Sequence, residues 1–123
     1  MKIVIDKKCQ NKIMDFFGEK KKECAGVIGI NDNGVITEFE PDIAPILSSK
    51  SCYIPNANNL EKIINILWNK KDVNFAGFIH LHLYNNEISE EDIVFFKELK
   101  RINHMDKIFC GIYFNKNIKW YTI

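Results

Sequence analysis

Residues 75–82 read Phe75-Ala76-Gly77-Phe78-Ile79-His80-Leu81-His82, and this stretch decides the fold that the sequence predicts. Its run of apolar residues predicts a buried β-strand. Side chains two positions apart in a strand point to the same face, so His80 and His82 are expected to direct both imidazoles at one point. Two histidines held together on a buried strand suggest a metal site.

Two amphipathic helices are predicted on either side of this strand. Upstream, apolar residues recur at helical spacing within 56–70. They are Leu60, Ile63, Ile64, Leu67 and Trp68. Downstream, Ser89 opens a helix expected to run to Ile102, with Ile93, Phe96 and Leu99 on one stripe. Asp92 shares that inward stripe, and a metal would remove the cost of burying its carboxylate.

The other predicted elements are shorter. They are strands at 2–5, 23–30, 35–39, 51–54, 107–114 and 117–122, and a helix at 8–17 that ends at Gly18. Asn33-Gly34 and Asn115-Lys116 predict hairpin turns. The order β-α-β-β-β-α-β-α-β-β implies a mixed β-sheet flanked by helices, of class α/β or α+β. A length of 123 residues suits a single domain, 1–123.

Charge and cysteine content limit the class of protein. A net charge of +1 offers no electrostatic basis for binding nucleic acid or an anionic membrane. No stretch approaches the roughly 18 apolar residues that span a bilayer, and residues 1–6 lack the apolar core of a signal peptide. The four cysteines include no CxxC pair, so we expect a reduced, cytoplasmic protein in which each cysteine is a small buried hydrophobe.

The residue types around the histidines leave two interpretations open. Catalytic zinc sites take three protein ligands and leave one position for water, and His80, His82 and Asp92 supply three. Alternatively, Ser89 and Asp92 form a capping arrangement at a helix start, and the histidines are core residues with satisfied hydrogen bonds. Capping and metal binding are compatible roles for Asp92.

Three segments together resemble the JAB/MPN family of zinc metalloproteases, which carry the JAMM motif. They are Glu23-Cys24-Ala25-Gly26-Val27-Ile28-Gly29, Gly77-Phe78-Ile79-His80-Leu81-His82 and Ser89-Glu90-Glu91-Asp92. The family pattern is a Glu three residues before a Gly in an apolar strand, then His-x-His, a short loop and Ser-x-x-Asp. The resemblance covers nearly the whole chain and implies a cytidine-deaminase-like JAB/MPN core of the compact prokaryotic type.

The resemblance also implies a role for each residue of the site. His80, His82 and Asp92 are expected to bind Zn²⁺. Glu23 is expected to act as the general base, and Ser89 to stabilise the oxyanion. Without the resemblance, Glu23 reads as a solvated charge at the end of the lysine run 20–22.

The implied activity is that of a zinc-dependent peptidase or isopeptidase. Its expected substrate is the tail of a ubiquitin-like or sulfur-carrier-like protein, cut after the C-terminal Gly. Another class of small peptide, or an amino-acid adduct of a carrier protein, is a further candidate. A non-catalytic interaction scaffold is the alternative function, although scaffolds of this family generally lose part of the ligand set and all five residues are present here. The sequence does not indicate an oligomeric state.

Two departures from the family pattern fall in one loop. Leu83 follows the second histidine where active members commonly have Pro, and residues 83–88 form a loop one residue shorter than usual. Neither departure removes a ligand. We therefore expect the 83–88 loop to influence the choice of substrate.

Overall fold

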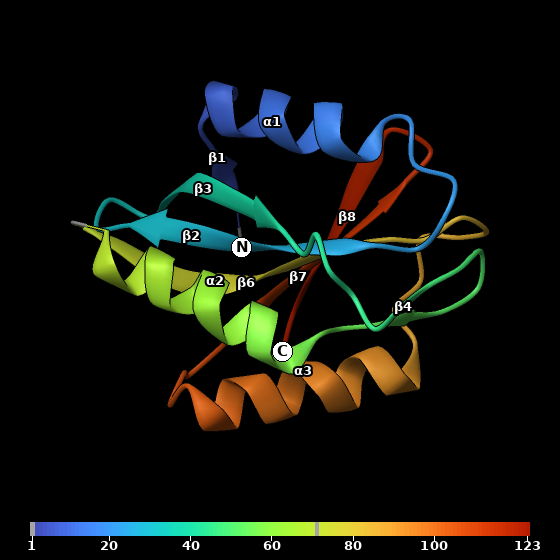
Figure 1. The fold of residues 1–123 in the computed structure, drawn as a ribbon. Helices are drawn as coiled ribbons and strands as arrows, with labels where there is room; N and C mark the ends of the chain where they lie inside the picture. The colour runs from blue at the N-terminus through green and yellow to red at the C-terminus, as the bar shows by residue number, and fades with distance from the viewer. Residues whose placement is uncertain (1, 71) are drawn as a thin grey trace.

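The computed structural model describes residues 2–70 and 72–123 and shows a mixed β-sheet with helices on both faces (Figure 1). The sheet strands are β1 (Val4–Ile5), β2 (Ala25–Asn31), β3 (Val35–Pro41), β6 (Val73–Leu81), β7 (Phe109–Phe114) and β8 (Asn117–Thr122). They pair in the order β1-β3-β2-β6-β7-β8. The β1–β3 and β6–β7 pairs are parallel and the others antiparallel, which confirms the predicted mixed sheet.

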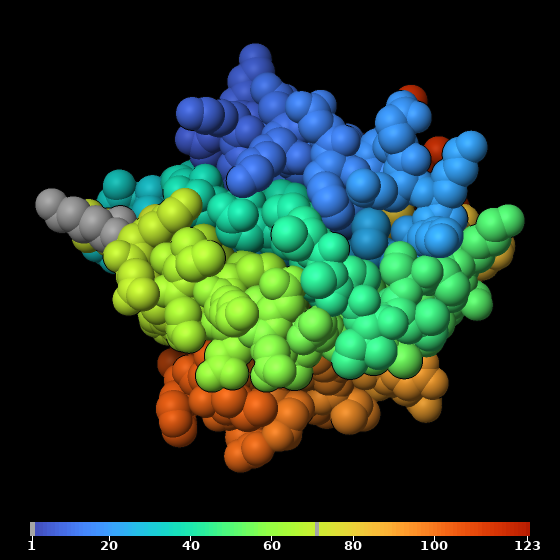
Figure 2. Space-filling model, viewed as in Figure 1, coloured from blue at the N-terminus to red at the C-terminus, as the bar shows by residue number. Residues whose placement is uncertain are grey.

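Three helices lie in the described part of the chain, close to their predicted positions: α1 (Lys7–Phe17), α2 (Ala57–Asn69) and α3 (Glu90–Ile102). Each begins after a side chain that accepts a hydrogen bond from a backbone N–H of the first turn. These capping residues are Asp6, Asn56 and Ser89. Helix α1 covers one face of the sheet, and α2 and α3 cover the other; Figure 2 shows α1 and α3 on opposite sides of the molecule.

Each face of the sheet has its own hydrophobic core. Phe17 of α1 packs with Ile28 and Ile79 on one face. Leu67 of α2 and Phe96 of α3 pack with Phe78 on the other. The sheet is therefore buried on both sides, as the continuous apolar runs of β2 and β6 require.

Both predicted hairpins form. Asn31 Oδ1 accepts hydrogen bonds from the N–H groups of Asn33 and Val35 at the β2–β3 turn, both at 3.0 Å. Asn115 and Lys116 both have positive φ angles, 52° and 64°, as a two-residue type I′ turn between β7 and β8 requires.

Three details differ from the sequence expectations. Trp68 is 43% exposed, because it lies about 80° around α2 from Leu60, at the edge of the apolar stripe. Cys52 is half-buried, whereas Cys9, Cys24 and Cys110 are buried as expected. The predicted strand at 51–54 is shorter, β5 (Tyr53–Ile54). It pairs with β4 (Leu47–Ser48), which was not predicted.

A β-bulge in β6 decides which face His80 occupies. The register between β2 and β6 shifts, so that Ile28 lies opposite Gly77 but Gly29 lies opposite Phe75. As a result Phe75 and Phe78, three residues apart, both pack on the α2–α3 face. His80 follows Phe78 by two residues and faces the same side.

Gly77 is required at this bulge. Its φ is +155°, and a Cβ atom added there would lie 1.8 Å from the carbonyl oxygen of Phe109 on β7. No side chain fits such an approach between two backbones.

We expect Gly77→Ala to lower the free energy of unfolding by about 3 kcal/mol or more, because strain at positive φ adds to a backbone clash. Gly34→Ala is the control: Gly34 also has a positive φ, +79°, but open space around it. It should cost about 1 kcal/mol. Urea denaturation measures both, and equal losses would show that the approach to β7 is unimportant.

Candidate metal centre

The predicted site residues converge at one end of β6. In the β2–β6 pairing Ala25 lies opposite His80, so Glu23, two residues earlier, is at the level of His82. His82 follows the last residue of β6, but its N–H donates to the Tyr113 carbonyl at 3.0 Å and continues the pairing with β7. Asp92 lies in the first turn of α3.

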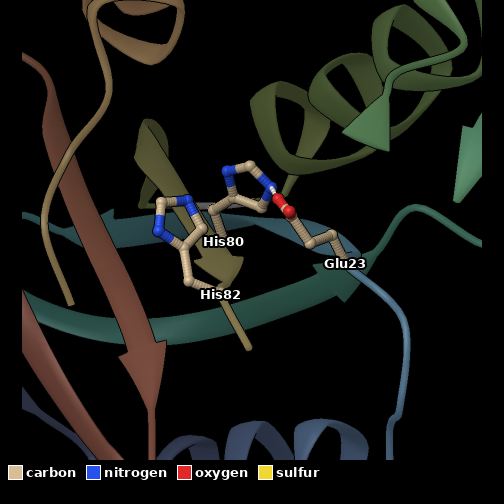
Figure 3. Close-up of side chains that lie close together, drawn as sticks. All are labelled: Glu23, His80 and His82. Carbon is tan, nitrogen blue, oxygen red and sulfur yellow. Dashed lines mark ion pairs between the residues drawn. The ribbon is translucent and has the colours of Figure 1, made fainter. Parts of the chain in front are cut away.

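The four ionisable side chains are in contact. His80 Nε2 lies 3.3 Å from Glu23 Oε1, as the dashed line in Figure 3 marks. His80 Nδ1 lies 3.3 Å from Asp92 Oδ1, and His82 Nε2 lies 3.3 Å from Asp92 Oδ2. The two imidazole centroids are 4.7 Å apart. One carboxylate therefore bridges both rings, while a second approaches His80 from the other side.

These residues fit a metal ion. Glu23, His80 and His82 each offer one ligand atom, and these atoms all lie within 4.8 Å of one another. His80 Nε2 is buried and, although Glu23 Oε1 lies 3.3 Å away, makes no hydrogen bond of acceptable geometry within residues 2–70 and 72–123. A buried nitrogen with no hydrogen-bond partner is costly, and ligation to a metal removes that cost.

The donor set permits two arrangements. In one, Glu23 joins the two histidines as a ligand, and Asp92 orients both rings. In the other, which the sequence predicted, Asp92 is the third ligand and Glu23 stands beside the metal. Asp92 is not among the described residues whose ligand atoms all lie within 4.8 Å of one another, because it faces His80 Nδ1 and not His80 Nε2. Carboxylates and neutral imidazoles suit zinc in either arrangement.

Contacts within the site favour the charged forms of His80 and Asp92. Burial lowers the pKa of His80, but its contacts with Asp92 and Glu23 outweigh burial and the net pKa is raised. Burial raises the pKa of Asp92, but its contacts with His80, His82 and Ser89 hold that pKa well below its usual range. The carboxylates thus attract positive charge to the end of β6, whether a proton or a metal cation.

Ser89 and Asp92 form the capping box that the sequence suggested. Ser89 Oγ accepts a hydrogen bond from the Asp92 N–H at 3.0 Å, and the Ser89 N–H donates to Asp92 Oδ2 at 3.3 Å. The same carboxylate reaches both histidines. Capping therefore fixes the direction of Asp92 toward the imidazoles, and the two roles coincide.

Two hollows meet at the site, and His80 and Asp92 line the first of them. One, of about 260 Å³, is walled by residues 51–55 and by Phe95 and Phe96 of α3. The other, of about 270 Å³, is walled by the 83–88 loop. Glu23, His82 and Ser89 line both. A chain lying across the site would have room on either side of these residues.

The 83–88 loop is braced without proline. Leu83 packs against the core on the α1 face, and Ile88 against the core on the α2–α3 face. The Tyr121 hydroxyl donates to the Asn86 carbonyl at 3.0 Å. The loop that departs from the family pattern is therefore anchored near its start, middle and end.

Tyr53 belongs to the site but was not predicted. Its ring lies 5.2 Å from the His80 ring, centroid to centroid. Its hydroxyl donates to the buried Asp42 carboxylate, and burial together with that bond raises the pKa of Tyr53 far above its usual value. No spacing in the sequence links Tyr53 or Asp42 to the histidines, since the contact arises only from the path of the β4–β5 hairpin.

No protein-family model matches the chain, and a search of curated proteins finds no match. Within the residues that the structure describes, no helix is long and apolar enough to cross a membrane.

We expect zinc to raise the melting temperature of the wild-type protein. Zinc at 100 times its dissociation constant should add about 2.7 kcal/mol of stability. His82→Ala and Asp92→Ala should each reduce the shift and the zinc content. His104→Asn is the control, because His104 is exposed and its φ of +53° suits Asn. A wild type without stoichiometric zinc after zinc is supplied would contradict the metal site.

Proposed function

We propose that this protein is a zinc-dependent peptidase or isopeptidase of the JAB/MPN type. The observation that carries the proposal is the convergence of Glu23, His80, His82 and Asp92 where two hollows meet. The motif spacing described above supports the family, and the helices on both faces of a mixed sheet are compatible with its core.

In the proposed site His80, His82 and Asp92 hold the zinc. Bound zinc would polarise the scissile carbonyl and lower the pKa of a water to about 7. Glu23 takes a proton from the attacking water and passes it to the leaving amine. Its side chain is 12% exposed and 3.3 Å from His80, so it is held at the site yet reachable from both hollows.

Ser89 is the proposed oxyanion donor. Its oxygen accepts the Asp92 N–H, and Ser89 lines both hollows, so by the proposal its hydroxyl hydrogen turns from the Asp92 carboxylate to the bound substrate. Directed at the substrate oxygen on which negative charge develops, this donor stabilises the transition state.

The proposed substrate is the tail of a ubiquitin-like or sulfur-carrier-like protein, cut after its C-terminal Gly. The first hollow is walled by Tyr53, Phe78 and Phe95, so the substrate chain on that side of the cleaved bond would lie against aromatic side chains. We place the protein in the cytoplasm, where its free cysteines would stay reduced.

Glu23→Gln should keep the zinc and lose cleavage of a ubiquitin-like C-terminal fusion by about 10²-fold or more, because Gln cannot accept the proton. Glu19→Gln, in the exposed α1–β2 connection, is the matched control. Zinc content and cleavage rate are measured together. Loss of zinc would make Glu23 a ligand, and persistent cleavage would remove it as the base.

Ser89→Ala, assayed with saturating zinc, should lower kcat by about 10²-fold, because one oxyanion donor is lost. It should also cost about 1 kcal/mol of stability through the lost cap. Cleavage is therefore measured well below the melting temperature of the variant. Unchanged kcat would exclude Ser89 as the oxyanion donor.

A wild type that binds zinc and cleaves neither fusions nor small peptides would favour the scaffold function.

A further inference from the structure

Asp42, outside the proposed catalytic set, is a buried carboxylate that accepts three hydrogen bonds. It is only 2% exposed. Its Oδ2 accepts the Tyr53 hydroxyl, and its Oδ1 accepts the Asn59 side-chain amide at 2.6 Å and the Ala44 N–H at 3.3 Å. Three donors offset the cost of burying this group. They join the end of β3, the β4–β5 hairpin and helix α2.

The β4–β5 hairpin holds the backbone of Glu23. Glu23 precedes β2, so the sheet ladder does not fix it. Instead the Glu23 N–H donates to the Ser49 carbonyl at 2.6 Å, and the Ser48 hydroxyl donates to the Glu23 carbonyl at 2.7 Å. Both backbone groups of Glu23 are thus bound by the last residue of β4 and the residue that follows it.

The same hairpin supports His80. Tyr53 of β5 lays its ring 5.2 Å from the His80 ring at an angle of 56°. The hydrogen bond to Asp42 fixes the other end of that tyrosine. The Asp42 N–H also donates to the Ala25 carbonyl at 2.9 Å, and Ala25 lies opposite His80 in the sheet. Asp42 therefore connects two parts of the site: its carboxylate holds Tyr53 of the hairpin, and its backbone N–H holds β2.

We propose that Asp42, Tyr53 and Ser48 are positioning residues, through which the β4–β5 hairpin sets Glu23 and His80 in their places. The expected effect of these residues on catalysis rests on the proposed function. Their positioning of Glu23 does not, because the hydrogen bonds to Glu23 exist whether or not Glu23 is a base. In this arrangement the β4–β5 hairpin forms a wall of the cleft. It also aligns the Glu23 carboxylate with the His80 imidazole.

The first test follows amide hydrogen exchange by NMR in the protein prepared without metal. Asp42→Asn keeps the shape of the side chain but offers an amide N–H₂ in place of one acceptor oxygen. The Glu23 and Ser49 amides should lose tenfold or more of their protection, while amides at the centre of β2 and β6 keep theirs. Asp32→Asn, in the exposed β2–β3 turn, makes the same chemical change and should alter neither set.

Tyr53→Phe is the second variant, because it removes only the hydroxyl bond to Asp42 and keeps the ring. It should loosen the Glu23 amide in the same way. Unchanged protection of Glu23 in both variants would overturn the proposal. So would an equal loss at every amide, since that is the result of general destabilisation.

The second test measures zinc affinity by competition with a chelator. Asp42→Asn and Tyr53→Phe should each weaken zinc binding by about tenfold, the loss typical of groups that orient metal ligands. Asp32→Asn should change affinity by less than about twofold. Wild-type zinc affinity in both Asp42→Asn and Tyr53→Phe would overturn the claim that the hairpin positions His80.

The third test separates this inference from the proposed function. Ser48→Ala should keep zinc affinity and lower kcat by about tenfold with KM unchanged, because Glu23 is no longer held in line. Thr122→Ala, on the edge strand β8, is the hydroxyl-deletion control. If wild type cleaves no fusion, the proposed function fails while hydrogen exchange still decides the positioning role. If wild type is active and Ser48→Ala matches it, the role of Ser48 fails alone.

Discussion

The pairing of His80 with two carboxylates is the constraint on which the site depends. Glu23 and Asp92 lie 3.3 Å from opposite nitrogens of one imidazole, and their side chains are only 12% and 14% exposed. Carboxylates held this close in a poorly solvated place repel each other unless positive charge lies between them. The fold therefore has to deliver a histidine, and by our proposal a zinc ion, to the same point.

Separate parts of the fold bring these groups together. The bulge at Gly77 turns His80 to the α2–α3 face, and the capping box at Ser89 turns Asp92 toward the imidazoles. The β4–β5 hairpin fixes the backbone of Glu23, which the sheet leaves unpaired. The bulge shifts the register of the sheet, whereas the cap and the hairpin use hydrogen bonds to the backbone.

The sequence predicted most elements because their signals are local. The periodicity of 60–67, the Asn33-Gly34 turn and the Ser89 cap depend on residues within a few positions of one another. It misplaced Trp68, because helical spacing alone does not show where the buried stripe of α2 ends, and Trp68 lies at its edge. It missed β4, since a two-residue strand has too little periodicity to be recognised.

For the site, the sequence by itself determined the residue types and the spacing of His80, His82, Ser89 and Asp92, because strand and helix geometry place such neighbours on one face. Only the tertiary structure decided that Glu23 meets His80, that Asp92 bridges both rings, and that Asp42 and Tyr53 stand behind them. These contacts join residues far apart in the chain. Their closeness depends on strand register and on the path of a hairpin, which no local pattern records.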